Sequence, residues 1–387
     1  MSHAVLVLNA GSSSLKFALY AKGAETPQIN GLIDRIGAGS AALKLRDADE
    51  RALTPPPIGT LADHRAALEI VLAATDLHCP DLTVTAVGHR VVHGGPDFAA
   101  PVVIDDAVLS ALEALIPLAP LHQPHCVAGI RAARAAFPDA AQIACFDTAF
   151  HRTMPELNQI YAIPRALYDQ GVRRYGFHGL SYDYIACALR AHDPALAAGR
   201  VIIAHLGNGA SLCAMRDGRS VATSMGFSAL DGLAMGTRSG KIDPGVLLYL
   251  LDQGTSPAEL SEMLYRRSGL LGLSGISSDM RTLEASDKPE AKQAIAYFIQ
   301  AITRGIAELT ATLGGLDTLV FTAGIGENSD LVRAEICKGL GWMGAALNAA
   351  ANETGAFNIA NADAAINLLV IPTREDLVIL RAIRAMS

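Results

Sequence analysis

The sequence is poor in aromatic residues and has no excess of positive charge. Aromatic side chains make up only 5% of its 387 residues, against 51% hydrophobic residues and 35 glycines. This mixture favours helices rich in Ala, Leu and Val packed on a buried sheet, and therefore an α/β enzyme. The 31 basic residues are outnumbered by 38 acidic ones, which argues against a nucleic-acid groove because such a groove needs a dominant positive field. Any anionic ligand must be bound by local groups.

The sequence also lacks long hydrophobic runs and paired cysteines. No apolar run approaches the roughly 18 residues that span a bilayer, and the apolar residues 4–8 follow no basic segment. The six cysteines are scattered, without a C-x-x-C pair or the spacing of a zinc site, and are interpreted as reduced core thiols. We therefore expect a cytoplasmic protein with no membrane or nucleic-acid partner. Its length suits two domains of about 150–200 residues each.

One strand-turn-strand pattern occurs twice. A strand at residues 5–8 runs into the turn NAGSSS and a second strand, and a strand at 201–204 runs into HLGNGAS and another strand. Glycine and small hydroxyl residues let a backbone approach a ligand and direct several N–H groups at one spot. Either turn alone is better explained as an ordinary hairpin. Their duplication favours two phosphate cradles that bind one nucleotide.

The remaining sequence alternates between helical and strand patterns. Residues 61–74 and 105–116 have helical spacing and alternate with short apolar runs at 84–87, 91–92 and 143–146, which predicts a parallel sheet with crossover helices. The proline-rich residues 37–60 are predicted to be a peripheral excursion without a regular strand.

In the second half, residues 292–313 are predicted to form one long amphipathic helix closed by Gly314 and Gly315. A strand at 318–321, a glycine turn at 323–328 and a helix capped by Ser329 follow, then a strand at 367–371 and a terminal helix. We expect that helix to fold back on the first domain. The expected domains are residues 1–148 plus 376–387, and residues 149–375, which bind the nucleotide.

Two arginines and one histidine are candidates for binding anions. Arg90, in GHRVVHGG, and Arg238, in MGTRSG, are flanked by glycines that offer no side chain to pair with. An arginine fork binds carboxylate or phosphate, although for either residue alone a surface salt bridge is as good an explanation. His178 precedes a helix expected to begin near Ser181, where it could donate a hydrogen bond to a phosphoryl oxygen, although a lone histidine is more often a core residue.

Two carboxylates follow buried strands. Asp147 stands directly after the strand 143–146, at the end of a strand where α/β sheets bind ligands. Glu375, with Asn9, could hold the water shell of a magnesium ion, although a helix N-terminus explains Glu375 almost as well. The histidine pairs at 89/93 and 122/125 have no nearby carboxylate or thiolate, so a transition-metal site is disfavoured.

Together these motifs resemble the acetokinase family, within the actin, Hsp70 and sugar-kinase superfamily. Matching segments run in order along nearly the whole chain, at residues 9–16, 88–95, 119–124, 146–151, 174–179, 205–209, 236–240, 279–281, 324–328 and 373–375. The resemblance implies a homodimer of two duplicated ribonuclease H-like domains, with ATP or ADP, Mg2+ (Mn2+ as an alternative) and a short-chain fatty acid in an interdomain cleft. It implies reversible transfer of the γ-phosphoryl group of ATP to acetate, which gives acetyl phosphate and ADP.

The resemblance also assigns roles to individual residues. Asn9 and Glu375 would hold the metal, Arg90 would bind substrate, Asp147 would be the active-site acid, and His178 and Arg238 would stabilise the transition state. The small apolar pocket for the alkyl end of the substrate would consist of Val92, Leu121 and Phe177. The nucleotide site would be lined by Lys16, His205, Leu206, Gly207, Asn208, Gly209, Asp279, Met280, Arg281, Gly324, Ile325, Gly326, Glu327 and Asn328.

At three positions this sequence differs from the residue that is common in the family. Lys241 stands where Asp is common, Ala229 replaces a common Pro, and Arg374 replaces a common Asn or Asp. Lys241 could alter the charge beside Arg238, and Ala229 could widen the acyl pocket. Neither removes a catalytic side chain.

The chemistry of the acceptor bears on the mechanism. Acetate is already ionised at neutral pH, with a pKa near 4 by analogy with Asp and Glu, so Asp147 need not act as a base and would instead orient an arginine or the hydrated magnesium ion. The alternatives are a propionate kinase, a hydroxyl kinase with Asp147 as base, and a nucleotide-switched binding protein like actin or Hsp70. A neutral sugar would leave one arginine without an anion, and no appendage for binding peptides is evident.

Overall fold

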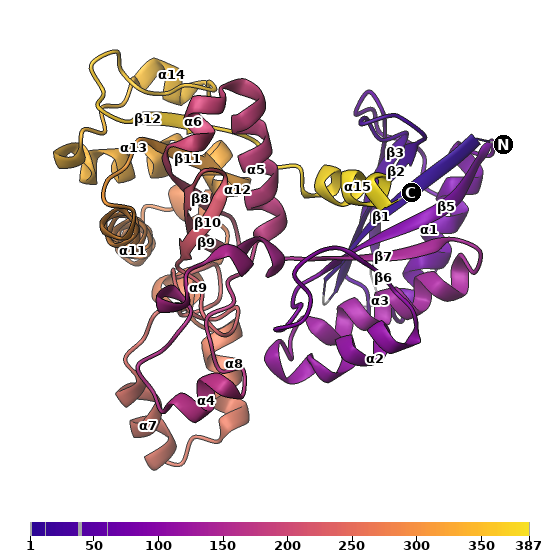
Figure 1. The fold of residues 1–387 in the computed structure, drawn as a ribbon, viewed down its shortest axis with the longest axis horizontal. Coiled ribbons are helices and arrows are strands. Elements are labelled where there is room, and N and C mark those ends of the chain that lie inside the picture. The colour runs from indigo at the N-terminus through magenta and orange to yellow at the C-terminus, as the bar shows by residue number, and fades with distance from the viewer. Residues whose placement is uncertain (1, 12, 38–40, 60, 387) are drawn as a thin grey trace. The chain divides into compact units, whose positions relative to one another are not determined.

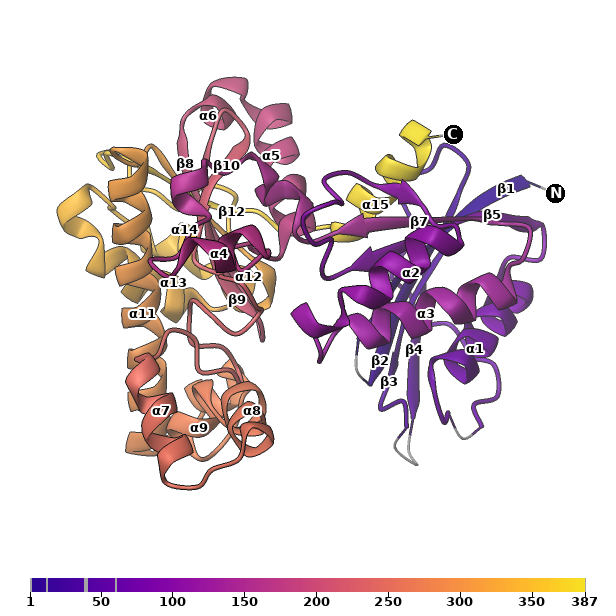
Figure 2. The same ribbon diagram turned by 60° about the horizontal axis from the view of Figure 1, so that its bottom comes forward.

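The computed structural model describes residues 2–11, 13–37, 41–59 and 61–386. It divides into two compact units, unit 1 with Met1–Ala149 and Arg374–Ser387, and unit 2 with Phe150–Thr373. Each unit is a sheet covered by helices on both faces (Figures 1 and 2). Ser12, part of the first expected cradle, and residues 38–40 and 60 of the expected excursion lie outside the described residues.

Unit 1 contains a seven-stranded mixed sheet in the order β4-β3-β2-β1-β5-β7-β6. Its strands are β1 (Ser2–Ala10), β2 (Ser14–Ala21), β3 (Ile29–Asp34), β4 (Ala42–Asp47), β5 (Leu82–Val91), β6 (Val102–Val103) and β7 (Ala141–Phe146). The neighbours β1, β5 and β7 are parallel, and the other pairings are antiparallel. The first predicted hairpin is confirmed as β1–β2, and the two apolar runs at 84–87 and 91–92 belong to the single strand β5.

The prediction that residues 37–60 hold no regular strand is wrong. Strand β4 lies in this segment and pairs with β3 at the edge of the sheet. Its sequence alternates apolar Leu43 and Leu45 with charged Lys44 and Arg46, and Leu45 is buried. This period of two is the ordinary signal of a half-buried strand, which the nearby prolines obscured.

Helices cover both faces of the unit 1 sheet. The helices α1 (His64–His78), α2 (Asp106–Ala114) and α3 (Gln123–Ala136) pack on one face, and the terminal helix α15 (Glu375–Met386) packs on the strands β1, β5 and β7 from the other (Figure 1). Asp63 and Asp105 cap α1 and α2 by accepting the backbone N–H groups of Ala66 and Val108. A short 3₁₀ turn, η1 (Ile116–Leu118), follows α2.

Unit 2 contains a five-stranded mixed sheet in the order β10-β9-β8-β11-β12. Its strands are β8 (Arg200–Leu206), β9 (Ala210–Arg216), β10 (Arg219–Thr223), β11 (Thr318–Thr322) and β12 (Asn367–Val370). The strands β8, β11 and β12 are parallel, and β8–β9 is the second predicted hairpin. On one face lie α5 (Gly179–His192) and α6 (Pro194–Ala198), and on the other α11 (Pro289–Leu313) and α12 (Ala323–Asn328) (Figures 1 and 2).

The predicted long helix is confirmed as α11, which ends at Gly314 with a left-handed φ of 70°. The helix α13 (Asp330–Gly339) is confirmed too, with Ser329 accepting the N–H of Val332 as its cap. The expected glycine turn at 323–328 is instead the short helix α12. The chain enters it through Ala323, whose φ of +66° makes the bend that we had expected glycine to make.

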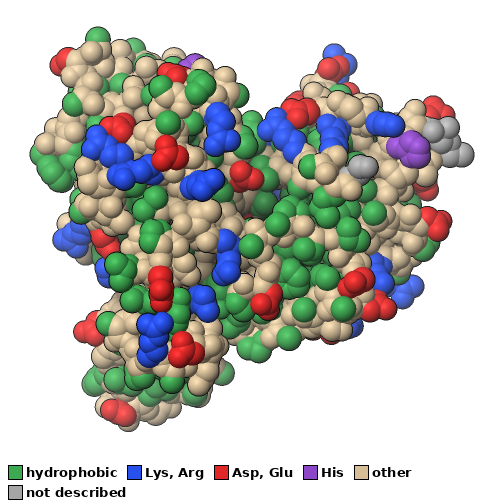
Figure 3. Space-filling view, in the orientation of Figure 1, with side chains coloured by type: hydrophobic (Ala, Val, Ile, Leu, Met, Phe, Trp, Pro, Cys, Tyr) green, Lys and Arg blue, Asp and Glu red, His purple; other side chains and the backbone are tan. Residues whose placement is uncertain are grey.

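Smaller helices complete unit 2 and the junction. These are α4 (Arg165–Asp169), α7 (Pro244–Asp252), α8 (Pro257–Arg266), α9 (Gly269–Ser274), α10 (Met280–Glu284), α14 (Ala349–Glu353), η2 (Ala149–Thr153), η3 (Glu156–Asn158) and η4 (Gly341–Met343). Large apolar side chains of α7, including Leu248 and Tyr249, are exposed, and hydrophobic atoms reach the surface of the lobe that contains α7 and α8 (Figure 3). None of the described helices is long and apolar enough to cross a membrane.

Helix α15 approaches β5 closely at Gly88. A Cβ atom built on Gly88 would lie 2.3 Å from Ile379 Cγ2 and 2.6 Å from Ile383 Cδ1. We therefore expect Gly88→Ala to destabilise the protein by about 1–3 kcal/mol through overpacking. Urea unfolding followed by circular dichroism measures this loss. Gly341→Ala is the control, since a Cβ there meets no atom within 4 Å; equal midpoints for the two variants would contradict the prediction.

Candidate functional site

A buried ion pair lies at the carboxyl edge of the unit 1 sheet. Arg90 is near the end of β5, and Asp147 directly follows the adjacent parallel strand β7. Arg90 Nε lies 3.0 Å from Asp147 Oδ1, and Nη2 lies 2.6 Å from Oδ2. Asp147 is only 1% exposed. The two hydrogen bonds fix the plane of the guanidinium group, because a bidentate pair restricts its orientation.

A second carboxylate faces the same guanidinium group. Arg90 Nη1 lies 3.5 Å from Glu375 Oε2, at the start of α15. As expected, the flanking glycines offer Arg90 no partner; its two carboxylate partners come from distant segments of the chain. Burial alone would lower the pKa of Arg90, but Asp147 and Glu375 raise it above its ordinary value. The guanidinium group thus stays charged.

A polar network holds the first turn of α15. Tyr20, which is fully buried on β2, donates a hydrogen bond to Asp376, and Arg374 donates to both Asp376 oxygens at 3.1 and 3.0 Å. Burial raises the pKa of Asp376, but the hydrogen bonds from Arg374 and Tyr20 outweigh it and lower the pKa overall. Arg374, which departs from the usual family residue, thus fixes the backbone that carries Glu375. Sequence reasoning missed this network because Tyr20 and Asp376 are 356 positions apart.

The expected metal ligand Asn9 and the expected nucleotide contact Lys16 face each other across the β1–β2 hairpin. The turn between them is closed by a hydrogen bond from Gly11 N–H to the Ser14 carbonyl, at 2.8 Å. Among the described residues there is no cluster of three His, Cys, Asp or Glu side chains around a metal position. Asn9 and Glu375 provide oxygen donors, which suit a magnesium ion that keeps waters and binds phosphates as its other ligands.

In unit 2, the β8–β9 turn lies beside α12. A Cβ atom on Gly207 would lie 3.7 Å from Ala323 Cβ and 4.0 Å from Gly324 N, so the two glycine-containing elements adjoin. The Gly207 N–H donates to the Gly209 carbonyl at 3.1 Å. In both hairpins the N–H of the first glycine therefore closes the turn. These two N–H groups are thus already hydrogen-bonded within their turns.

Two charged side chains hold α12 in place. Glu327 Oε1 accepts the backbone N–H groups of Ala323, at 2.7 Å, and Thr373, at 3.1 Å. Arg333, on α13, is 1% exposed and donates to the carbonyls of Gly326 and Glu327 at 3.0 and 2.9 Å. Arg333 also donates to Asn352. Sequence reasoning missed Arg333, although a cation beside Val332 on the apolar face of a helix is a signal that could have identified it.

The turn that carries Arg238 is attached to the β8–β9 turn. Gly236 N–H donates to the Asn208 carbonyl at 2.9 Å, and a Cβ on Gly236 would lie 1.9 Å from Asn208 Oδ1, so only glycine fits. Arg238 Nη1 donates to the Ala229 carbonyl at 3.0 Å. Lys241, expected to alter the charge beside Arg238, lies 3.6 Å from Glu308 Oε2 in an exposed ion pair.

His178 lies beside the same turn. It precedes α5 with a left-handed φ of 60°, an uncommon conformation for a residue other than glycine. Its Nδ1 lies 2.7 Å from Ser211 Oγ, and a Cβ on Gly209 would lie 3.2 Å from its Nε2. The ring of His205 stacks on it with centroids 4.2 Å apart. The structure thus brings His178, His205 and the Gly207–Gly209 turn together.

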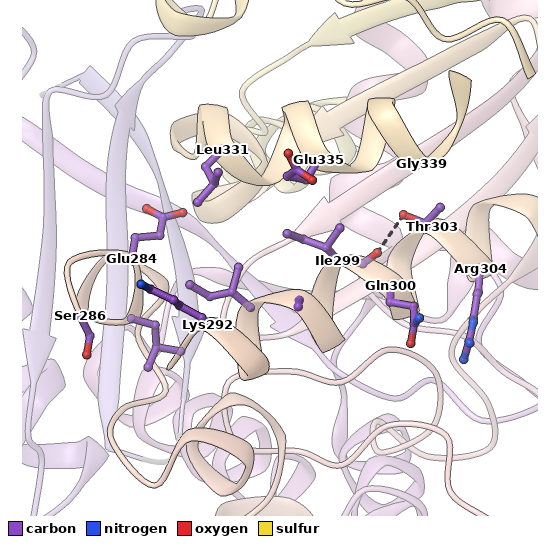
Figure 4. A pocket seen from close by; sticks show the side chains of 13 residues that line it. Glu284, Ser286, Lys292, Ile299, Gln300, Thr303, Arg304, Leu331, Glu335 and Gly339 are labelled. Atoms are coloured by element: carbon purple, nitrogen blue, oxygen red, sulfur yellow. Dashed lines mark hydrogen bonds between the residues drawn. The ribbon is translucent and has the colours of Figure 1, made fainter. Parts of the chain in front are cut away.

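The other expected residues are distributed between the units. Val92 and Phe177 are buried, in unit 1 and unit 2 respectively, and Leu121 is partly exposed in unit 1. Asp279 caps α10 and pairs with Arg281 at 2.7 Å. Beyond α10, a groove of about 550 Å³ runs between α10, α11 and α13 (Figure 4). Leu283 and Leu331 line it, two and three residues after the expected nucleotide contacts Arg281 and Asn328.

Two compact units, each built on a mixed sheet, define a two-domain α/β fold of the actin, Hsp70 and sugar-kinase type. A family profile described as the acetokinase family matches residues 4–381. The chain belongs to the acetokinase family, and the resemblance inferred from its motifs is confirmed.

Named relatives and solved structures agree with this assignment. The chain is 50% identical to an acetate kinase of Methylocella silvestris, over 98% of this chain and 97% of that protein. It is 48% identical to an acetate kinase of Rhizobium meliloti, over 98% and 97%. The crystal structure of Porphyromonas gingivalis acetate kinase superposes with a TM-score of 0.88 at 34% identity, covering 100% of both chains. A propionate kinase from Francisella tularensis gives a TM-score of 0.92 at 38% identity, covering 99% of both.

Two other histidines near these clusters are buried and predict a pH dependence of stability. Burial lowers the pKa of His89 and of His151 to about 4, although hydrogen bonds oppose it. In the unfolded chain a histidine has a pKa of about 6.5, so the unfolded state binds more protons between these values. The stabilisation is present above pH 6.5 and is lost as the pH falls towards 4.

We expect His89→Gln to reduce the slope of unfolding free energy against pH by up to about 1.4 kcal/mol per pH unit between pH 6.5 and 4. Glutamine does not titrate and keeps an N–H donor for Gln142, which His89 Nε2 contacts at 2.8 Å. Urea unfolding at a series of pH values measures the slope. His192→Gln, at an exposed position, is the control, and an unchanged slope in His89→Gln would refute the prediction.

Proposed function

We propose that the protein transfers the γ-phosphoryl group of ATP reversibly to the carboxylate of acetate, by in-line displacement. Membership of the acetokinase family supports this reaction. The observation that carries it is Arg90, a guanidinium group held permanently charged and fixed in plane at the carboxyl edge of a sheet. Such a group suits an ionised acceptor better than a neutral hydroxyl.

Arg90 binds and aims the acetate carboxylate. Asp147 occupies the edge of the guanidinium formed by Nε and Nη2, so acetate would bind on the edge that includes Nη1. Acetate brings no proton to be removed, because a carboxylic acid with a pKa near 4 is ionised at neutral pH. Asp147 therefore acts by orienting Arg90 and not as a base. Val92, Leu121 and Phe177 are each proposed to contact the methyl group of acetate.

Residues of unit 2 bind the nucleotide and stabilise charge on the transferring group. His205 to Gly209 and Gly324 to Asn328 would bind the phosphates, with Lys16 from unit 1, and Asp279 to Arg281 would contact the nucleoside. The adenine base would enter the groove near Leu331 (Figure 4), where the apolar side chains of the lining, Leu283 among them, suit a flat ring. Arg238 and His178 would donate hydrogen bonds to the γ-phosphoryl oxygens as charge gathers there.

Asn9 and Glu375 fit a magnesium ion, since both offer oxygen atoms and Glu375 is fixed by the hydrogen-bonded first turn of α15. When bound, magnesium neutralises phosphate charge and orients the phosphates. We also propose that the two units are the two functional domains and that the protein is a cytoplasmic homodimer. The exposed apolar side chains of α7 support association, because surfaces of this kind are usually covered by a partner.

A panel of acceptors tests the reaction. The protein is incubated with MgATP, hydroxylamine to trap acyl phosphate, and acetate, propionate or a sugar in separate samples. We expect hydroxamate with acetate at the highest kcat/KM. Higher kcat/KM with propionate would indicate the propionate kinase, the alternative supported by Ala229 in place of a common Pro and by the similarity to the Francisella structure. ADP released only with a sugar, or slow hydrolysis indifferent to acceptor, would refute the proposal.

Arg238→Ala tests the proposed role in the transition state. If Arg238 acts only on charge that develops during transfer, kcat falls by a factor on the order of 10³ or more with little change in the KM for ATP. Initial rates over a range of ATP concentrations measure both constants. Arg281→Ala is the matched control and should instead raise the KM for ATP. An Arg238→Ala variant that keeps kcat but binds ATP weakly would contradict the assignment.

A further inference from the structure

Three buried side chains of unit 2 form a hydrogen-bonded chain that ends on His178. The Tyr182 hydroxyl, on α5, is in short contact with Ser211 Oγ, on β9, and Ser211 Oγ lies 2.7 Å from His178 Nδ1. Tyr182 and Ser211 are both fully buried. The opposite nitrogen of the imidazole, Nε2, lies on the side of the glycine turn at Gly209.

The direction of each hydrogen bond in this series follows from the protons that its members carry. Burial raises the pKa of Tyr182 well above its ordinary value, so the phenol keeps its proton. That proton is donated to Ser211 Oγ, the polar atom that the hydroxyl contacts. Ser211 has a single hydroxyl proton of its own, and its other neighbour is His178 Nδ1. When Ser211 donates that proton to Nδ1, which then acts as an acceptor, every hydroxyl proton of the chain has a partner.

We propose that Tyr182 and Ser211 are positioning residues that keep His178 neutral, with its proton on Nε2 facing the glycine turn. The proposal rests on the proposed role of His178 as a donor to the phosphoryl group. An imidazole that carries its proton on Nε2 can donate that hydrogen bond without being protonated. In an imidazolium, Nδ1 would be a donor, so Ser211 Oγ would have to accept from both Tyr182 and Nδ1, and the Ser211 proton would lose Nδ1 as its acceptor.

The surroundings favour the neutral form as well. On β8, His205 stacks on His178 with an angle of 19° between the rings, and two stacked imidazolium groups would repel each other. His205 Nδ1 is itself 2.9 Å from Ser181 Oγ. The other titratable groups that pack around this chain are Cys213, on β9, and His151, whose ring meets the Tyr182 ring edge-on. Burial keeps both of these neutral, since it raises the pKa of Cys213 to about 12 and lowers that of His151 to about 4.

Nitrogen NMR of protein labelled with ¹⁵N-histidine tests the proposal directly, with the His178 signal assigned from its loss in His178→Gln. In the wild-type protein we expect the Nε2–H form at neutral pH. In Tyr182→Phe the ring is kept, but Ser211 loses the hydrogen bond that strengthens its own donation to Nδ1, so the protonation midpoint of His178 should rise by about one pH unit. In Ser211→Ala the preference for Nε2–H should weaken. Tyr184→Phe changes a tyrosine of the same helix that is not part of this hydrogen-bonded series. It should change neither the tautomer nor the protonation midpoint of His178.

The pH dependence of kcat is the second measurement. If His178 must be neutral, the acidic limb of the kcat profile should move to higher pH in Tyr182→Phe, by the shift that NMR records, while the KM for ATP changes little. An Nδ1–H form in the wild-type protein, or a midpoint unchanged in Tyr182→Phe, would overturn the proposal even if the enzyme makes acetyl phosphate. Conversely, the expected NMR result with full activity in His178→Gln would leave the proton order intact and refute the catalytic role of His178.

Discussion

The buried Arg90–Asp147 pair is the interaction on which unit 1 depends. It joins the ends of β5 and β7, and its contact with Glu375 adds the first turn of α15, so three distant segments meet on one guanidinium group. Removing one partner of a buried pair commonly costs 3–5 kcal/mol, because the remaining charge stays desolvated. The chain therefore cannot lose the acidic partners without destabilising the sheet edge at which its anionic substrate is proposed to bind.

In unit 2, too, buried polar side chains hold separate segments together, here around turns that contain glycine. A Cβ atom would meet Asn208 Oδ1 at 1.9 Å on Gly236 and Ala323 Cβ at 3.7 Å on Gly207, so the loops lie close together, and buried polar groups hold their backbone. Arg333 holds the end of α12 through carbonyls, Glu327 holds its start through N–H groups, and His178 adopts a left-handed conformation before α5. Unusual backbone conformations of this kind persist only where surrounding contacts determine them, and they concentrate at functional sites.

Local patterns made much of the fold predictable, and the failures have physical causes. The two hairpins, α11 and the cap of α13 follow from alternation, helical spacing and the preference of serine for an N-cap. Strand β4 was missed because prolines nearby outweighed its alternation, and α12 because its glycines suggested a turn. Motifs identified Arg90, Asp147 and Glu375 singly. Their mutual contacts, and the networks through Tyr20 and Ser211, join residues too far apart in sequence for spacing to reveal.

The charges around Arg90 bear on the proposed role of a metal ion. One guanidinium group against the carboxylates of Asp147 and Glu375 leaves this edge of the sheet with one excess negative charge, which by itself opposes acetate. A divalent cation between Asn9 and Glu375 would reverse that sign, because the charge of a bound ion dominates its surroundings. Arg90 alone would therefore orient the acetate carboxylate but would not attract it strongly enough. Glu375 weakens the attraction of Arg90 for an anion. It is also the carboxylate that would bind the divalent cation, whose charge would restore that attraction.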